Sequence, residues 1–204
     1  MRYGRAVTRT EWDVLLLGGA SGIGKSRAAA QLARETGAFI VEFDDVVSAV
    51  QNITSAAQHP GLHHFDTVPD PGRLDPERVV ELQIATANAL EPALLGVVRN
   101  RLTVDVAAVV EGDYLTPAAA LRARKEGAAA GRTVRAVFLH EDDAAQITAN
   151  YTDREPEHGT QRRRADISAR YSRWLAQQAA LHALPVVDCR PWHTLTHRLR
   201  QAAH

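Results

Sequence analysis

Short apolar runs recur along the chain and alternate with segments of helical spacing. The runs at residues 14–17 and 106–110 contain no regular polar alternation, which predicts strands buried on both faces of a sheet. Further apolar runs at residues 38–43, 134–139 and 186–188 predict three more strands. Because strands and helical segments alternate, the pattern predicts an α/β fold with a five-stranded parallel sheet and helices on both faces.

Capping residues and helix breakers mark the predicted helices. The first begins at Ser26 and ends before Gly37, whereas Asp75 and Pro76 are typical of the first residues of a helix. Pro92 predicts either a kink or a join as that helical segment continues. The remaining predicted helices cover residues 116–127, 141–151 and 165–184 and the segment after the fifth strand.

Residues 51–75 show neither the apolar runs of the strands nor the helical spacing of apolar residues, and they are rich in Pro, His and Asp. Since long loops in compact domains are usually functional or mobile, we expect this segment to form the substrate side of the site. His63 and His64 are its candidate substrate contacts, and a plain polar loop is the alternative. A zinc site that includes His59 is disfavoured because no cysteine or fourth ligand follows at a suitable spacing.

Length and composition narrow the class of protein. The 204 residues suit a single domain over residues 1–204, and a formal net charge of +0 argues against a general nucleic-acid binder. The single cysteine, Cys189, cannot form an internal disulfide, which fits a reducing compartment. No apolar run could span a membrane and no apolar signal core opens the chain, so we expect a cytoplasmic protein with a small-molecule partner. The oligomeric state stays open.

A complete phosphate-binding loop, GxxxxGKS, follows the first predicted strand. A strand leads into a glycine-rich turn whose backbone N–H groups point at an anion, and the next helix adds the positive end of its dipole. The sequence therefore predicts a nucleoside triphosphate site, with ATP as the expected nucleotide. The predicted nucleotide-binding residues are Gly19, Ala20, Ser21, Gly22, Ile23, Gly24, Lys25, Ser26 and Arg27.

The use of lysine supports this assignment. Lys25 and Lys125 are the only lysines, and all the other residues that are positively charged at neutral pH are arginines. A compact ammonium on a flexible stem reaches the β- and γ-phosphates more readily than a planar guanidinium. Lys25 is therefore the predicted catalytic lysine of the loop.

Acidic residues follow the second and third predicted strands. Asp44 and Asp45 end the second, and Glu111 and Asp113 end the third. Ligands of open parallel sheets bind at the carboxyl ends of the strands, and phosphoryl transfer needs carboxylates to hold Mg²⁺ and to accept a proton. The four acids are thus candidate substrate-binding residues, although acids also occur simply where a buried strand emerges into water.

These motifs resemble a family of kinases. GGASGIGKS with EGDYLTP is similar to 2-phosphoglycerate-kinase-like proteins, and GGASGIGKS with FDDVVSAV resembles the chloramphenicol phosphotransferases. The order of elements looks like that of small-molecule P-loop kinases of the nucleoside monophosphate kinase type. The resemblance implies Asp44 as general base or ligand of the substrate hydroxyl, Ser26 as Mg²⁺ ligand, and Glu111 near Mg²⁺-bound water or substrate. The doublet leaves the choice between Asp44 and Asp45 open, since one of the two can instead cap the helix that follows, and Asp45 is the expected cap.

An arginine-rich segment at residues 152–164 follows the fourth strand and its helix. It contains Arg154, Arg162, Arg163 and Arg164, with Pro156 and Gly159 between them. The resemblance implies a lid whose guanidinium groups reach the transferred phosphoryl group after closure, and Arg154 is the predicted catalytic residue. The alternative is a solvated helix face.

The leading functional prediction is an ATP-dependent kinase that phosphorylates a hydroxyl of a metabolite, nucleoside or antibiotic. The alternatives are a P-loop ATPase of assembly or mechanical type and a nucleotide-binding module without catalysis. A GTP-dependent switch would need a guanine-reading NKxD segment, and neither lysine lies in one. Few arginines lie near residues 51–75, which favours a neutral acceptor over a phosphorylated one.

Overall fold

The structure, a computed structural model, describes residues 10–204. Its five strands form one parallel sheet in the order β2-β3-β1-β4-β5, which confirms the predicted fold class. The strands are β1 (Val14–Gly18), β2 (Phe39–Glu42), β3 (Ala108–Gly112), β4 (Val134–His140) and β5 (Val186–Asp188).

The register of the central strands brings two of the sequence motifs together. Leu17 pairs with Glu111, and Gly18 pairs with Gly112. The phosphate-binding loop therefore leaves β1 beside the acids that end β3. Both lie at the carboxyl edge of the sheet, where ligands of such folds bind.

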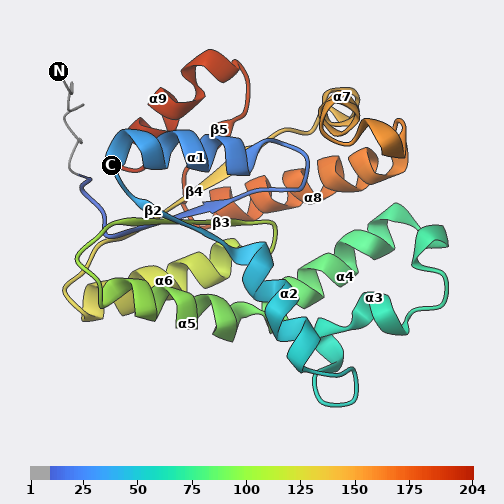
Figure 1. The fold of residues 1–204 in the computed structure, drawn as a ribbon, viewed down its shortest axis with the longest axis horizontal. Helices are drawn as coiled ribbons and strands as arrows, with labels where there is room; N and C mark the ends of the chain where they lie inside the picture. The colour runs from blue at the N-terminus through green and yellow to red at the C-terminus, as the bar shows by residue number, and fades with distance from the viewer. Residues whose placement is uncertain (1–9) are drawn as a thin grey trace.

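Helices cover both faces of the sheet (Figure 1). One face carries α1 (Lys25–Thr36) and α9 (Trp192–Ala202), and the other carries α5 (Glu91–Leu102), α6 (Pro117–Ala129) and α8 (Arg162–Leu181). Within residues 10–204, no helix has both the length and the apolar character needed to cross a bilayer.

The other helices gather beyond the carboxyl edge of the sheet (Figure 1). They are α2 (Phe43–Ile53), α4 (Pro76–Ala89) and α7 (Ala144–Arg154). The predicted loop 51–75 contains the short helix α3 (His64–Thr67) and the 3-10 turns η1 (Pro60–Leu62) and η2 (Pro71–Arg73). Leu90 separates α4 from α5, so Pro92 marks a join between two helices.

The core lies on both sides of β1 and β3, whose residues are all buried. Leu15, Leu16 and Leu17 are fully excluded from solvent, and burying each side chain contributes about 1.5–3 kcal/mol before the entropy of ordering is subtracted. Tyr151 and Tyr171 are among the largest fully buried side chains. The core therefore extends from the sheet into α7 and α8, which fixes these helices beside the phosphate-binding loop.

Several predicted boundaries were wrong. The third strand is Ala108–Gly112 and not residues 106–110, and Val106 is exposed before the strand begins. The helix predicted over residues 141–151 is α7 at Ala144–Arg154, because Asp143 caps it, and α8 ends at Leu181 before residue 184.

The second strand ends at Glu42, and Phe43 starts α2 because its side chain and that of Val47, four positions on, are buried on one helix face. Asp45 consequently lies in the first turn and is not the cap, a position that Glu42 occupies. The long helix α8 begins at Arg162 and not at residue 165, so the arginine triplet is helical.

Candidate active site

The phosphate-binding loop is supported by aromatic side chains from two distant helices. Gly22 has φ 76° and Gly24 has φ 90°, a region that favours glycine. A Cβ atom at Gly22 would lie 2.6 Å from the Tyr151 ring, and one at Gly24 would overlap the Trp192 ring. Asn150 Nδ2 also donates to Gly22 O at 2.8 Å. These glycines are thus required by both the turn and the close approach of the rings.

Lys25 points toward the end of β3. Its side chain is 6% exposed, and its ammonium donates to Asp113 Oδ1 in an ion pair and to Ala20 O at 3.2 Å. Burial by itself lowers the pKa of Lys25, but the carboxylates of Asp113 and Glu111 outweigh it, so the pKa is raised. The lysine is therefore charged, and its ammonium lies between the phosphate-binding loop and the end of β3.

Asp44 lies against the same end of β3. The backbone N–H of Asp113 donates to Asp44 Oδ1 at 3.3 Å, and Gly112 leaves room for this approach because a Cβ there would lie 3.2 Å from that oxygen. Partial burial of the carboxylate and then the charge of Asp113 raise the pKa of Asp44 to about 6. Both aspartates are exposed by surface area, but only Asp44 accepts a hydrogen bond from the end of β3, and Asp45 makes no hydrogen bond or ion pair within residues 10–204. The geometry favours Asp44 over Asp45 as the base.

Glu111 is a buried acid without a full set of partners. The residue is 3% exposed, and its Oε2 has no hydrogen-bond partner among residues 10–204. Burial raises the pKa of Glu111, while Lys25 and the Ser26 hydroxyl lower it. Mg²⁺ fits this site, because a cation would give the orphaned oxygen a partner and offset the cost of its burial. Ser26 and Glu111 are the residues that would hold it.

Two of the predicted lid arginines stack on the tyrosine that supports the loop. Arg154 Cζ lies 5.2 Å and Arg164 Cζ 4.3 Å from the centroid of the Tyr151 ring. Both guanidinium groups also donate to Glu155, at 2.9 Å from Arg154 Nε and 2.8 Å from Arg164. Hydrogen bonds from Gln161 and Arg154 lower the pKa of Glu155 to about 2. The Tyr151 ring therefore contacts both guanidinium groups as well as Gly22 of the phosphate-binding loop.

The other two arginines of the segment point elsewhere. Arg163 donates to Leu74 O, at the end of the substrate-side loop. Arg162 is exposed and has no hydrogen bond or ion pair within the described part of the chain. The segment 152–164 comprises the end of α7, the 3-10 turn η3 (Pro156–His158) and the start of α8. Its closure as a lid stays a prediction.

The two predicted histidine contacts differ in their surroundings. His63 is buried, with Nδ1 2.8 Å from Asp66 Oδ2 and Nε2 3.0 Å from Thr54 Oγ1. Because both ring nitrogens are engaged, this geometry favours a structural role over the predicted substrate contact. His64 is half-buried and its ring makes no hydrogen bond among residues 10–204, so its contact with substrate stays a prediction.

Sequence reasoning missed three side chains that shape the site. Tyr151 and Asn150 contact Gly22, and the Tyr171 hydroxyl donates to Asp113 O at 3.0 Å. Both tyrosines lie in predicted helices, at residues 141–151 and 165–184, and belong to none of the motifs that the sequence shows. The glycines of the loop are the one signal in the sequence that other side chains approach the loop closely. They do not identify those side chains.

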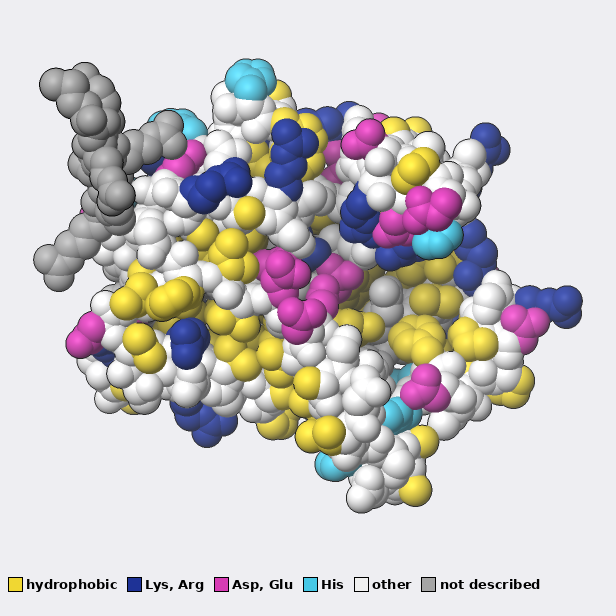
Figure 2. Space-filling model, viewed as in Figure 1, with side chains coloured by type: hydrophobic (Ala, Val, Ile, Leu, Met, Phe, Trp, Pro, Cys, Tyr) yellow, Lys and Arg dark blue, Asp and Glu magenta, His cyan; other side chains and the backbone are white. Residues whose placement is uncertain are grey.

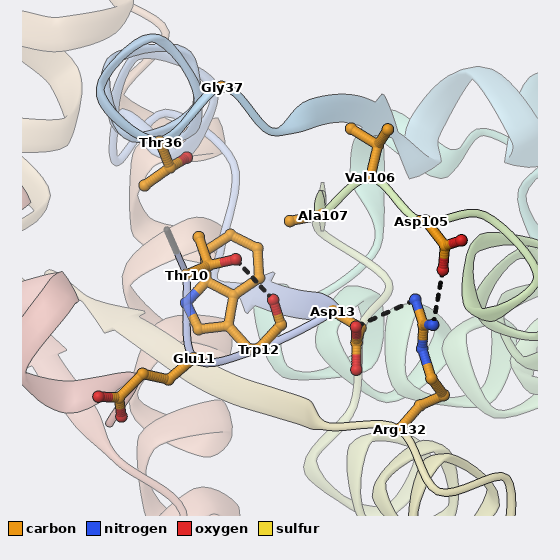
Figure 3. A pocket seen from close by; sticks show the side chains of 10 residues that line it. All are labelled: Thr10, Glu11, Trp12, Asp13, Thr36, Gly37, Asp105, Val106, Ala107 and Arg132. Carbon is orange, nitrogen blue, oxygen red and sulfur yellow. Dashed lines mark hydrogen bonds and ion pairs between the residues drawn. The ribbon is translucent and has the colours of Figure 1, made fainter. Parts of the chain in front are cut away.

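A cavity within residues 10–204 lies away from this site. It has a volume of about 570 Å³ and lies at the amino ends of the strands (Figure 3). Arg132 crosses its wall, with ion pairs to Asp13 and Asp105 at 3.0 Å each.

The fold and the site together define a P-loop nucleotide-binding protein with a kinase-like α/β fold. The AAA_33 family, described as an AAA domain, matches residues 14–184, and the chain belongs to this family. A gluconokinase from Sinorhizobium meliloti 1021 is similar in structure, with a TM-score of 0.61, 16% identity, and coverage of 96% of this chain and 93% of that chain. At that identity the similarity shows the fold.

A second similar structure is described as shikimate kinase from Acinetobacter baumannii in complex with shikimate. Its TM-score is 0.46 and its sequence identity 12%, with coverage of 94% of this chain and 90% of that chain. No curated protein sequence matches the chain.

Proposed function

We propose that the chain is an ATP-dependent phosphotransferase that moves the γ-phosphoryl group of Mg²⁺-ATP to a hydroxyl of a small molecule. One observation carries the proposal. Asp113 joins the lysine of the phosphate-binding loop to the candidate base, since its carboxylate pairs with Lys25 and its N–H binds Asp44. A carboxylate at that place can accept the proton of an acceptor hydroxyl as it attacks the γ-phosphoryl group.

Each residue has a role in this mechanism. The loop N–H groups bind the phosphates, and Lys25 neutralises the β- and γ-oxygens. Mg²⁺ held by Ser26 and Glu111 would supply further charge neutralisation. Asp44 accepts the proton of the acceptor hydroxyl, and Arg154 or Arg164 stabilises charge on the transferred group. Positioning and electrostatics account for most of the catalysis.

The acceptor binds on the side of α2, α3 and α4. Figure 2 shows acidic side chains gathered near the start of α2, beside a hollow whose visible lining is largely hydrophobic. The nearby arginines are already paired, Arg73 with Asp70 at 3.0 Å and Arg78 with Glu81 at 2.7 Å. This surface fits a neutral acceptor better than a phosphorylated one, because its carboxylates would repel an anion.

An acceptor screen tests the proposed function. The purified protein is incubated with Mg²⁺-ATP and a panel of neutral, acidic and phosphorylated alcohols, and ADP release and product mass are both measured. The proposal expects ADP release that depends on one class of acceptor, with a phosphorylated product. ATP turnover that no acceptor changes would favour the second candidate, a P-loop ATPase of assembly or mechanical type. Nucleotide binding without turnover would indicate a non-catalytic module.

Glu111→Gln is expected to raise the Mg²⁺ concentration needed for half-maximal activity by about 10- to 100-fold. The substitution keeps the shape of the side chain but removes the charge that the cation would neutralise. The measurement is a Mg²⁺ titration of ADP release at saturating ATP. Glu11→Gln, an exposed acid at the amino end of the sheet, is the control. An unchanged Mg²⁺ requirement in Glu111→Gln would remove this residue from the metal site.

Arg154→Ala and Arg164→Ala are expected to lower kcat by about 100-fold or more, with a smaller rise in the KM for ATP. Negative charge spreads over the equatorial and leaving-group oxygens in the transition state, so a guanidinium stabilises that state more than bound ATP. Steady-state kinetics measure the effect, and Arg162→Ala, which removes no hydrogen bond or ion pair within residues 10–204, is the control.

Limited proteolysis tests whether these arginines belong to a moving lid. The segment 152–164 should resist cleavage when a nucleotide is bound and become more sensitive without it. If kcat is unchanged in both variants and nucleotide does not change the rate of cleavage, the arginines form only a solvent-exposed helix face.

A further inference from the structure

We propose that Asp113 is an exchangeable counter-ion of Lys25. Its carboxylate pairs with the ammonium until a nucleotide phosphate replaces it, and the released carboxylate then faces the acceptor beside Asp44. This inference rests on the nucleotide binding of the proposed function and not on the transfer step.

The burial of the two partners shows which one moves. The Lys25 side chain is 6% exposed and that of Asp113 is 20% exposed. Lys25 also donates to Ala20 O inside the phosphate-binding loop, which keeps the ammonium in place. A buried ammonium needs a negative partner at all times, whereas a carboxylate near the surface can turn to water at little cost. Phosphate binding therefore displaces Asp113 and leaves Lys25 where it is.

The backbone of Asp113 is fixed on both sides. Its N–H donates to Asp44 Oδ1 at 3.3 Å, and its carbonyl accepts from the Tyr171 hydroxyl at 3.0 Å. Tyr171 is buried in α8, so this anchor belongs to the core. The exchange is thus a rotation of one side chain, which keeps the carboxylate next to Asp44 and does not require the loop after β3 to move.

The consequence is a link between the two halves of the site. Before nucleotide binds, the Asp113 carboxylate is neutralised by Lys25. After exchange, this carboxylate is unpaired and lies on the acceptor side. There it can accept a hydrogen bond from the acceptor molecule, in addition to the one that Asp44 accepts. Nucleotide binding then favours acceptor binding, and by linkage the acceptor favours the nucleotide by the same factor.

Affinity for ADP in the absence of metal tests the exchange. Isothermal titration calorimetry with EDTA present compares wild type, Asp113→Asn and Asp45→Asn. Asp113→Asn is expected to bind ADP about tenfold more tightly, because the phosphate no longer competes with a carboxylate for Lys25. Asp45→Asn removes the same charge from the exposed neighbouring position on α2 and should change affinity by less than about twofold.

The outcomes separate the possible roles of Asp113. Equal or weaker binding of ADP by Asp113→Asn would overturn the exchange and indicate a permanent structural pair. Weaker binding only when Mg²⁺ is present would also overturn it and indicate a metal ligand. Wild-type protein that binds no ADP under any condition would instead refute the proposed function.

A crystal structure of the wild-type protein with ADP gives a second test that does not depend on a variant. The exchange predicts that Lys25 Nζ contacts a phosphate oxygen while the Asp113 carboxylate lies beyond ion-pair distance. An intact Lys25–Asp113 pair beside bound ADP would overturn the proposal. Circular dichroism of Asp113→Asn shows whether its calorimetry reports on a folded protein.

Discussion

Lys25→Ala is expected to abolish measurable phosphoryl transfer, with a loss of at least about 1,000-fold in kcat/KM. The ammonium is the positive side chain nearest the predicted position of the β- and γ-phosphates, and the structure holds it there with Ala20 and Asp113. The substitution removes this charge and also leaves the Asp113 carboxylate to repel the phosphates. ATP affinity should therefore fall together with kcat.

The Lys25 side chain is buried. Lys25→Ala therefore leaves a small cavity as well as an unpaired acid, and Lys25→Met, which restores most of the volume, separates the two effects. Lys125→Ala is the control, since it replaces the only other lysine, which is exposed on α6. Circular dichroism and thermal melts report the fold. Kinase activity retained in a folded Lys25→Met protein would refute the proposed mechanism.

The strands were predictable because their signal is local. Residues 14–17 and 106–110 are apolar without alternation, as expected of central parallel strands, and the structure buries β1 and β3 on both faces, although β3 begins at Ala108, two residues later than predicted. The phosphate-binding loop was predictable because its chemistry needs glycine and lysine at fixed offsets. The start of α2 was not, because β2 passes into the helix without an intervening loop and Phe43 fits either state.

The arrangement of the site depends on contacts between distant residues. Which of Asp44 and Asp45 faces Lys25 is decided by the phase of α2, and one residue corresponds to about 100° around a helix. The Lys25–Asp113 pair joins positions 88 apart in the sequence. Tyr151 supports Gly22 only because α7 folds back over the loop. The spacing of residues in the sequence does not encode these contacts. It therefore identified the lysine and the acids of the site, but not which of them contact one another.

Asp44→Asn is expected to lower kcat by about 100-fold or more while ATP affinity stays nearly unchanged. The amide keeps the shape of the side chain and can still accept the N–H of Asp113, but it cannot take the proton of the acceptor. Because the pKa of Asp44 is raised to about 6, wild-type kcat/KM should fall as the pH drops below that value. The variant should lack this acid limb, and Asp45→Asn should keep it.

Stability should respond to the same substitution with the opposite sign. The folded protein favours protonated Asp44, because burial and Asp113 raise its pKa from 3.8 to about 6. The stabilising contribution of this group is therefore fully present below pH 3.8 and is lost as the pH rises through about 6. At pH 7.5, Asp44→Asn should melt at a higher temperature than wild type, and the difference should shrink toward pH 4.

These two measurements on Asp44→Asn distinguish a catalytic base from an ordinary surface acid. A base held beside other carboxylates costs stability at the pH where it works, so lower activity and a higher melting temperature should occur together. A surface acid would change neither by much. If Asp45→Asn instead causes the larger loss of kcat and Asp44→Asn leaves the melting temperature unchanged at pH 7.5, the assignment of the two residues is reversed.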